Sequence, residues 1–308
     1  MTRHIIITGA SGFLGRYVAR HFANQGWLVS GIGHAAENFT PSIWGISHWV
    51  ERDINSDSLS VLIEHVGKPG VLVHCAGTGS VGKSWETPLK EFERTVLTTA
   101  TVIDALRRLA PNALLVYPSS AAVYGESEDD TLAEDSLLHP MSPYGLHKLA
   151  AEDLCLGAHR IFGINVAIIR FFSIYGPTLR KQLLWDITRK LGSGNSVLKL
   201  DGTGDECRDF IYADDAARLV GHIADMSPRE PLVVNGATGA PTTVALVAKA
   251  IVEEMGKNDS VRVEFSGISR AGDPSRLVGD IRKLELIGFN SKVNVEEGIK
   301  HFISALNH

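Results

Sequence analysis

Tyr144 and Lys148 are the residues whose types and spacing are best suited to acid–base chemistry. They follow Ser142 and Pro143, which suit the N-cap and first position of a helix, and apolar residues then recur at helical spacing to about residue 161. Four residues apart on a helix, the two side chains lie on one face. A phenol beside a fixed ammonium ion ionises more readily, so the pair could exchange protons near neutral pH. An isolated Tyr and Lys at this spacing are more often ordinary surface residues.

A glycine-rich segment near the start of the chain is typical of dinucleotide binding. The apolar residues 4–8 predict a buried strand, and Gly9, Gly12 and Gly15 follow it where a helical pattern begins. Glycine lets the backbone approach a pyrophosphate, which then lies against the N–H groups and the positive end of the helix. The alternative is a tight turn without a ligand.

The strand expected at residues 27–34 bears on the choice of cofactor, because it ends in Gly33 and His34. An acid usually stands there to bind the adenosine ribose of NAD, and its absence gives NADP a slight preference over NAD. Asp53, after the next apolar run, is expected near the adenine. Residues 71–77 predict another buried strand that ends in small residues, and His74 within it is interpreted as structural.

The composition excludes several classes of protein. In 308 residues, 44% are hydrophobic, 21% are charged and the formal net charge is −5, which fits a globular enzyme and disfavours nucleic acid as a partner. No apolar run is long enough to span a membrane, and the N-terminal residues do not resemble a signal peptide. Cys75, Cys155 and Cys207 are too scattered for a disulfide framework or a zinc site. We therefore expect a cytoplasmic enzyme without a metal.

A pair of serines, Ser119 and Ser120, follows the strand expected at residues 113–118. Open α/β sheets bind ligands at the carboxyl ends of their strands, so a hydroxyl there should face the cofactor crevice. The glycine segment, this serine pair and the start of the Tyr144 helix are thus expected at one edge of the sheet.

Five segments, in the same order along the chain, carry a resemblance to a known family. They are Thr8–Gly15, Ser119–Gly125, Ser142–Lys148, Arg170–Pro177 and Arg208–Asp215. Together they resemble the extended short-chain dehydrogenase/reductase family, in its branch of NAD(P)-dependent nucleotide-sugar epimerases and dehydratases. The resemblance implies an α/β fold with a Rossmann-type doubly wound parallel sheet and a smaller C-terminal substrate-binding domain.

The same resemblance implies where the domains lie and what the chain binds. Residues 1–172 are expected to form the dinucleotide-binding domain, with elements near 208–238 returning to it. Residues 173–207 and 239–308 are expected to form the substrate-binding domain. The implied substrate is a nucleotide-diphosphate sugar. The amphipathic segments at 88–109 and 143–161 either pair with a second copy in a homodimer or simply cover the sheet.

The resemblance also implies roles for individual residues. Tyr144 is the catalytic acid/base, Lys148 lowers its pKa and holds the nicotinamide ribose, and Ser120 hydrogen-bonds the reacting oxygen. Besides Tyr144 and Lys148, the expected cofactor contacts are Gly9, Ser11, Gly12, Phe13, Leu14, Gly15, His34, Asp53, Ile54, Ala76, Gly77, Thr95, Ser119 and Phe171. The expected substrate contacts are Val81, Ser120, Ala121, Ala122, Tyr144, Ser173 and Arg208. Arg208 matches the family arginine that grips the diphosphate, and a salt bridge with Asp209 or Glu206 is the alternative.

The sequence departs from the family pattern at several of these positions. Dehydratases of this branch carry an Asp-Glu pair where this chain has Ala121 and Ala122, and alanine cannot exchange protons, so dehydration is not expected. Ser173 and Thr95 stand where relatives carry Asn, and both keep a hydrogen-bonding group. Asp214 and Asp215 are interpreted as helix-capping residues and not as metal ligands.

Three functions remain open at this stage. The first is an epimerase that acts at C4 of the sugar through a transient 4-keto intermediate. The second is an NADPH-dependent 4-keto-sugar reductase, which the missing acid at residue 34 favours. The third, a non-catalytic NAD(P)-sensing regulatory protein, is disfavoured because Ser120, Tyr144 and Lys148 are all present. The overall pattern resembles epimerases more, so epimerase stands first by a narrow margin.

Overall fold

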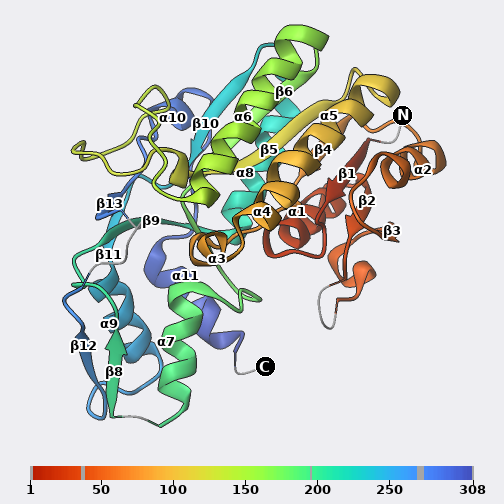
Figure 1. Ribbon diagram of the computed structural model, residues 1–308. Helices are drawn as coiled ribbons and strands as arrows, with labels where there is room; N and C mark the ends of the chain where they lie inside the picture. The colour runs from red at the N-terminus through yellow and green to blue at the C-terminus, as the bar shows by residue number, and fades with distance from the viewer. Residues whose placement is uncertain (1–2, 36–38, 195, 269–273, 307–308) are drawn as a thin grey trace.

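A seven-stranded parallel sheet forms the centre of the molecule (Figure 1). The computed structural model describes residues 3–35, 39–194, 196–268 and 274–306. The strand order is β10-β6-β5-β4-β1-β2-β3. The strands are β1 (His4–Thr8), β2 (Leu28–Gly33), β3 (His48–Glu51), β4 (Val71–His74), β5 (Leu114–Ser120), β6 (Asn165–Phe171) and β10 (Leu232–Gly236). The predicted Rossmann-type sheet is confirmed.

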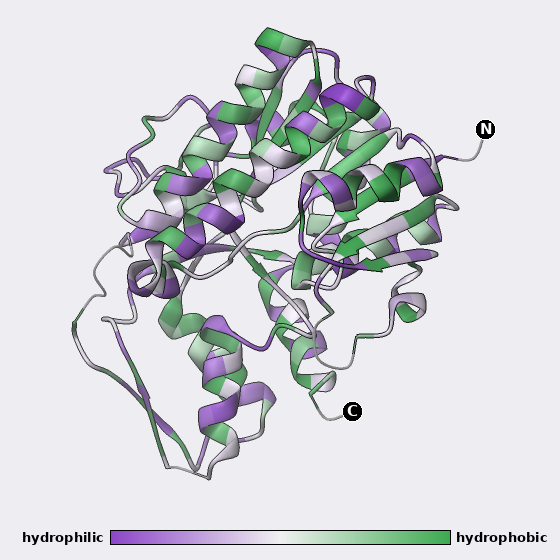
Figure 2. Cartoon of the chain, turned by 45° about the vertical axis from the view of Figure 1, so that its right-hand side comes forward, coloured by the Kyte–Doolittle hydropathy of each residue, from purple (hydrophilic) through white to green (hydrophobic). Residues whose placement is uncertain are grey.

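Helices cover both faces of this sheet and bury a separate core on each. One face carries α1 (Phe13–Asn24) and α8 (Ala213–Met226). The other carries α2 (Ser56–Val66), α5 (Thr98–Leu109) and α6 (Pro143–Phe162). Successive residues of β1 serve the two cores in turn: Ile5 and Ile7 pack on the α1 side and Ile6 on the other. In Figure 2 the helices carry hydrophobic and hydrophilic residues around each turn, as helices with one buried face do.

A second group of elements surrounds a third core, below the large sheet in Figure 1. Its helices are α7 (Gln182–Gly192), α9 (Val244–Glu254) and α11 (Val295–Ser304), and α10 (Arg282–Leu286) packs beside β10. In its small sheets, β9 (Cys207–Tyr212) pairs with β7 (Ser173–Tyr175), β11 (Pro241–Thr243) and β13 (Arg276–Leu277), and β8 (Val197–Leu200) pairs with β12 (Arg262–Phe265). Thus the chain leaves the large sheet after β6 and returns to it with α8 and β10.

Helix α6, which carries Tyr144, begins and ends where the sequence predicts. The Ser142 hydroxyl accepts a hydrogen bond of 3.1 Å from the Gly145 amide, and Pro143 occupies the first helical position. The helix ends at Gly163, whose φ of 70° is a left-handed conformation that glycine tolerates.

The helix expected at residues 88–109 is divided into three parts. It begins as α4 (Pro88–Phe92), continues through a π-helical turn at Glu93–Leu97 and becomes α5. A π turn inserts an extra residue into the helical repeat and often occurs at functional sites. Here the turn buries Thr95 and Val96. Ahead of α4, the short helix α3 (Val81–Glu86) lies beside the start of α6 (Figure 1).

The interpretation of Asp214 and Asp215 as N-caps is wrong: Tyr212 is the N-cap of α8, and the two acids stand two and three positions after it, in the first turn. Asp214 pairs with Arg20 at 2.6 Å, and Asp215 accepts hydrogen bonds from the amides of Lys292 and Val293. Within the described ranges, His, Cys, Asp and Glu side chains do not gather into any group that could hold a metal ion. None of the described helices is long and apolar enough to cross a membrane.

Candidate active site

The glycine segment forms a turn in which side chains would clash with neighbouring backbone. Gly9 has a φ of +65°, and a Cβ there would lie 2.7 Å from the Ala76 nitrogen. A Cβ on Gly15 would lie 2.3 Å from the Gly9 oxygen. Helix α1 begins at Phe13 after Gly12, whose missing side chain leaves the first helical amides uncapped. These residues fit a dinucleotide, whose pyrophosphate the α1 amides would bind.

His34 and Asp53, both expected to contact the adenosine half of the cofactor, lie side by side. The Ser11 hydroxyl donates to the His34 carbonyl at 2.5 Å, which fixes the end of β2 against the glycine segment. The His34 Nε2 atom lies 2.7 Å from Asp53 Oδ1, and these two side chains are 71% and 82% exposed. A carboxylate from the segment after β3 therefore lies beside the residue that follows β2. The following residue, Ile54, packs partly into the core on the α2 side.

The end of β4 presents backbone toward the same crevice. The Ala76 amide donates to Thr8 Oγ1 at 3.3 Å, and a Cβ on Gly77 would lie 3.6 Å from Thr95 Oγ1. His74 is buried, lies 2.7 Å from the same Thr8 oxygen, and burial lowers its pKa to about 3. His74 is thus neutral and structural, as interpreted from the sequence.

The three predicted catalytic residues come together at the ends of β5 and α6. Ser120 is the last residue of β5; its hydroxyl lies near Tyr144, whose pKa it lowers, and accepts a 3.2 Å bond from the Ala122 amide. The Lys148 Nζ atom lies 6.0 Å from the centroid of the Tyr144 ring and donates to the Pro118 carbonyl at 2.9 Å. Serine, phenol and ammonium therefore share one site.

Burial dominates the electrostatics of this site. Burial raises the pKa of Tyr144, the nearby hydroxyl of Ser120 lowers it, and the charge of Glu91 raises it. Burial lowers the pKa of Lys148 to about 8, although Glu91 acts in the opposite direction. Burial thus keeps the pKa of Tyr144 above its ordinary value in the protein by itself. That Lys148 lowers this pKa stays a prediction.

Helix α3 and the turn after β5 fix the start of α6. The Tyr144 amide donates to Ser84 Oγ at 3.1 Å, and this hydroxyl donates to the Val81 carbonyl at 2.6 Å. A Cβ on Gly145 would lie 2.4 Å from the Ala122 oxygen. Val81 and Ala122 thus lie close to the start of α6, and their contact with a substrate stays a prediction. The Ala121 side chain is only 3% exposed and packs inward, so its backbone alone remains for a substrate.

Two of the residues expected to touch the cofactor have side chains that face away from the crevice. The Ser119 hydroxyl donates to the Glu152 carboxylate, which also forms a 2.9 Å ion pair with Arg170. The Phe171 ring is 3% exposed and belongs to the core on the α1 side. For both residues, cofactor contact is restricted to the backbone at the strand end. The cause is the tight packing of the parallel sheet on both faces.

On the substrate side, Arg208 is nearly buried on β9. Its Nη1 donates to the carbonyls of Cys207 and Ser275 at 2.8 Å and 3.4 Å. The Glu206 carboxylate accepts from the Thr203 and Gly204 amides, and Asp209 accepts from amides of the 238–239 turn. Ser173 opens β7, which pairs with β9 and brings Ser173 opposite Phe210. The two predicted substrate contacts therefore lie on neighbouring strands.

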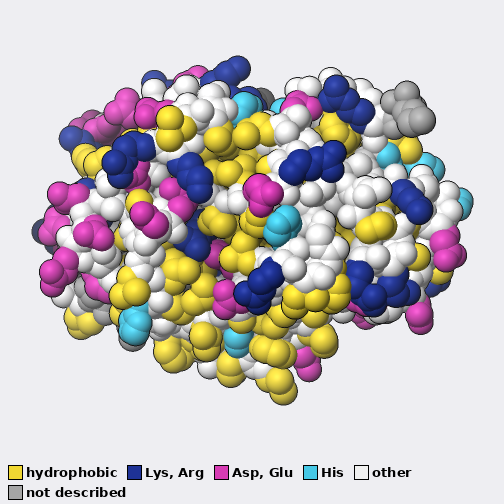
Figure 3. Space-filling model, turned by 90° about the horizontal axis from the view of Figure 1, so that it is seen from above, with side chains coloured by type: hydrophobic (Ala, Val, Ile, Leu, Met, Phe, Trp, Pro, Cys, Tyr) yellow, Lys and Arg dark blue, Asp and Glu magenta, His cyan; other side chains and the backbone are white. Residues whose placement is uncertain are grey.

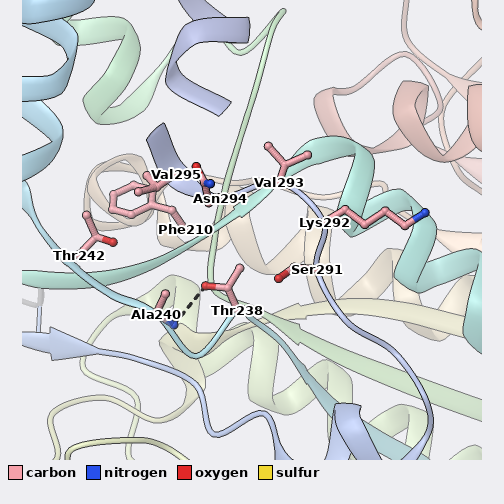
Figure 4. Close-up of a pocket in the computed structure, with 9 residues that line it drawn as sticks. All are labelled: Phe210, Thr238, Ala240, Thr242, Ser291, Lys292, Val293, Asn294 and Val295. Carbon is pink, nitrogen blue, oxygen red and sulfur yellow. Dashed lines mark hydrogen bonds between the residues drawn. The ribbon is translucent and has the colours of Figure 1, made fainter. Parts of the chain in front are cut away.

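A pocket of about 240 Å³ opens farther along β9 (Figure 4). It is lined by Phe210, Thr238, Ala240, Thr242, Ser291, Lys292, Val293, Asn294 and Val295. Figure 4 shows the Thr238 hydroxyl pointing toward the Ala240 amide, 3.2 Å away. These lining residues include none of the predicted site residues, so the pocket is distinct from the site around Tyr144.

A buried acid that the sequence did not single out borders the site. Glu91, on α4, is 2% exposed at its side chain and contacts His147, the residue that precedes Lys148. The apolar pattern provides no signal for it, because Leu89 and Phe92 are 70% and 41% exposed and α4 buries this acid instead. Such a residue is rarely buried without a partner.

Comparison with known proteins places these features in a family. A model of the NAD dependent epimerase/dehydratase family matches residues 5–235. The chain belongs to this family. The match spans the glycine segment, Ser120, Tyr144, Lys148 and Arg208, so it covers the residues that carried the resemblance.

Individual members of the family are similar to this chain over almost its whole length. A putative UDP-glucose 4-epimerase of Methanocaldococcus jannaschii is 26% identical over 304 residues, covering 97% of each chain. A UDP-glucuronate 4-epimerase of Thermodesulfobacterium geofontis is 25% identical over 316 residues, covering 98% of this chain and 95% of its own. The solved structure of MoeE5 in complex with UDP-glucuronic acid and NAD is 27% identical, with a TM-score of 0.87 over 99% of each chain. These similarities support the epimerase interpretation over the reductase alternative.

Proposed function

We propose that this family member is an NAD-dependent nucleotide-sugar 4-epimerase. The observation that carries the proposal is the convergence of Ser120, Tyr144 and Lys148 beside a glycine segment that fits a dinucleotide. The similarity in sequence and length to proteins named as UDP-sugar 4-epimerases supports the same reaction.

The reaction needs a proton and a hydride to leave the same C–O–H unit and return. NAD, held by the glycine segment and the α1 amides, would supply a hydride acceptor for C4 and a donor for its return to the opposite face of the sugar. Tyr144 takes the proton from the C4 hydroxyl as the carbon becomes a ketone, and returns it when the hydroxyl re-forms. Ser120, which lies near Tyr144, stabilises the reacting oxygen. A positioned acid/base of this kind contributes about 10²–10⁴-fold to the rate.

Lys148 supports this proton transfer from a buried position. Its ammonium group points to the Pro118 carbonyl and lies over the Tyr117 ring, 4.8 Å from the centroid. Burial alone raises the pKa of Tyr144, so a second positive charge is needed beside the phenol to produce phenolate near neutral pH. The ionisation of Tyr144 is therefore coupled to cofactor binding in this account.

The cofactor in this proposal is NAD. The slight preference for NADP rested on the missing acid at the end of β2, and Asp53 supplies a carboxylate beside His34 at that place. A carboxylate suits the ribose hydroxyls of NAD and repels a 2′-phosphate. Titration of the purified protein with both cofactors tests this: tighter binding of NADP overturns the choice.

Dehydration is not part of the proposed activity. Alanines at 121 and 122 have no proton to exchange, and the Ala121 side chain is buried. The family name includes dehydratases, so the point needs its own measurement. Release of a 4-keto-6-deoxy sugar from UDP-glucose, detected by mass spectrometry, would contradict it.

The experiment that separates the epimerase from the reductase is a measurement of cofactor stoichiometry. UDP-glucose and UDP-glucuronic acid are incubated with a catalytic amount of NAD, and the C4 epimers are separated by chromatography. We expect many turnovers per cofactor and no net change in absorbance at 340 nm. Consumption of one NADPH per sugar, with a 4-keto sugar as substrate, would establish the reductase instead.

We further propose that residues 173–207 and 239–308 hold the nucleotide sugar and that two copies of the chain form a homodimer. Exposed apolar residues on the α4–α5 segment and on α6 support the dimer: Leu89, Leu97, Leu146, Leu154 and Ile161 are all more than a third exposed. Figure 3 shows hydrophobic side chains gathered along its lower edge, the side that faces the viewer in Figure 1. Such a surface is typical of an interface between chains.

Light scattering of the purified protein tests the dimer. We expect twice the chain mass for the native protein and a single-chain mass for Leu154→Glu. The matched control, Leu286→Glu, changes an 85% exposed leucine on α10 and should leave the mass unchanged. A native protein of single-chain mass would refute the dimer.

A further inference from the structure

Glu91 is a buried carboxylate that receives hydrogen bonds from three separate parts of the chain. Its Oε1 atom accepts from Thr78 Oγ1 at 3.0 Å and from Thr95 Oγ1 at 2.6 Å. Its Oε2 atom is hydrogen-bonded to Nδ1 of His147. The carboxylate is 2% exposed and the His147 side chain 14%. All three groups can act as donors, which is the arrangement an ionised carboxylate requires.

The three donors border the proposed catalytic site on different sides. Thr78 belongs to the loop that leads from β4 to α3, and α3 in turn holds the Tyr144 amide through Ser84. Thr95 lies in the π-helical turn, facing Gly77. His147 lies on α6 between Tyr144 and Lys148, with its ring edge-on to Phe92 at 5.5 Å. One side chain thus links the loop, the π turn and the catalytic helix.

A buried charge in this position acts on its neighbours as well as holding them. The titratable groups of α6 that face Glu91 are Tyr144, His147 and Lys148. Two other elements pack against α4, namely α3 and the π turn, and their charged residues Lys83, Glu86, Glu93 and Arg94 are all exposed. Glu152 is the other buried acid near Lys148, but of the two only Glu91 acts on both Tyr144 and Lys148.

We propose that Glu91, through its bonds to Thr78, Thr95 and His147, is a positioning residue for proton transfer by Tyr144. The inference rests on the proposed epimerase function for its kinetic consequence but not for its structural one. The carboxylate holds the start of α6 against the β4–α3 loop, so that phenol, serine and ammonium keep their relative positions. Its negative charge also favours the ammonium form of Lys148 and opposes premature ionisation of Tyr144.

The principal variant is Glu91→Gln, which keeps the size of the side chain and removes its charge. We expect kcat to fall by about tenfold to a hundredfold, the effect of losing hydrogen bonds to a charged group, with KM changed less than about threefold. The acid limb of the pH–rate profile should move to lower pH, because removal of the negative charge lowers the pKa of Tyr144. A residue with a merely structural role would reduce the rate without moving that limb.

Glu93→Gln is the matched control, since Glu93 is an exposed acid two residues away. It should leave the rate, the pH profile and the stability unchanged. If Glu91→Gln does not fold, as judged by circular dichroism, His147→Gln serves in its place. It disturbs the hydrogen bond between Glu91 and His147 and leaves the sequence of α4 unchanged. A pH profile and a rate within about twofold of wild type in the folded variant would overturn the proposal.

Hydrogen exchange of residues 142–148 separates this proposal from the proposed function. Faster exchange in Glu91→Gln, and native exchange in Glu93→Gln, is the expected result even if no sugar is converted. An active wild-type enzyme whose Glu91→Gln variant exchanges and turns over normally would refute the role of Glu91 alone. A wild-type protein that converts no nucleotide sugar would refute the epimerase alone.

Discussion

Two buried carboxylates have different surroundings: Glu91 on α4 packs against helix α6, and Glu152 belongs to α6 itself. Glu152 is 1% exposed and meets the guanidinium of Arg170 through contacts of 2.9–3.2 Å, so its charge is balanced by a fixed opposite charge. The same guanidinium reaches the Tyr124 hydroxyl at 3.2 Å. Glu91 has two hydroxyls and an imidazole as its partners.

The difference indicates that Glu91 and Glu152 have different roles. The Glu152 network joins β5, β6 and α6 and compensates its own charge, so it supports the fold. The Glu91 charge is compensated less completely and acts on both Tyr144 and Lys148, so it supports the chemistry. Each of the following predictions tests this distinction.

The largest effect is expected from a substitution of Tyr144. Tyr144→Phe removes the proton carrier while keeping the ring, so turnover should fall by about 10²–10⁴-fold. Cofactor binding and thermal stability should change little, because the substitution keeps the ring and removes only the hydroxyl oxygen. Activity within a few-fold of wild type in an epimer-formation assay would show that another group is the base.

Disruption of the Glu152–Arg170 ion pair should reduce stability. Arg170→Leu leaves the Glu152 carboxylate buried without its cation, which costs about 3–5 kcal/mol of unfolding free energy. Urea denaturation measures this directly. Glu91→Gln, compared in the same assay, should lose less stability than activity. Equal stability losses in Arg170→Leu and Glu91→Gln would show that the two carboxylates do not differ in role.

The pKa of Lys148 makes stability depend on pH in a predictable direction. Its pKa falls from 10.5 in the unfolded chain to about 8 in the folded protein, so the unfolded state binds more protons between these values. Wild-type stability relative to Lys148→Met should therefore rise as the pH increases from 8 to 10.5, by at most about 3 kcal/mol. Urea denaturation of both proteins across this range gives the difference. A flat or falling difference would mean that burial does not depress the Lys148 pKa.

The smallest effect is expected far from both carboxylates, at the cofactor's adenosine end. Asp53→Asn removes the carboxylate beside His34 and should weaken NAD binding several-fold, the loss expected for one hydrogen bond. Binding of NADP should weaken less or improve, because a negative charge is removed from the place of a 2′-phosphate. Equal changes for the two cofactors, measured by calorimetry, would show that Asp53 does not discriminate between them.

The parts of the site that depend on backbone geometry could be predicted from the sequence. Glycines 9 and 15 stand where any Cβ would collide with backbone, and Ser142 and Pro143 start a helix by local rules, so residue type alone carries the information. The sheet and the site around Tyr144 follow from such features.

The side-chain contacts of the site could not be predicted in this way, because each polar side chain had several possible partners. Ser119 bonds Glu152 because β5 is packed on both faces, and Asp53 approaches His34 from a different strand. The pKa of Tyr144 depends on burial, and Glu91 joins α6 across 56 residues of sequence. None of these relations has a spacing that local sequence patterns reveal.

The central claim is that hydride leaves C4 and returns to the same carbon under control of Tyr144. A nucleotide sugar with deuterium at C4, UDP-glucose or UDP-glucuronic acid, tests it most directly. The account predicts that the C4 epimer keeps the deuterium at C4 with no exchange into solvent, as measured by NMR and mass spectrometry. An epimer that has lost its label to solvent would contradict the account.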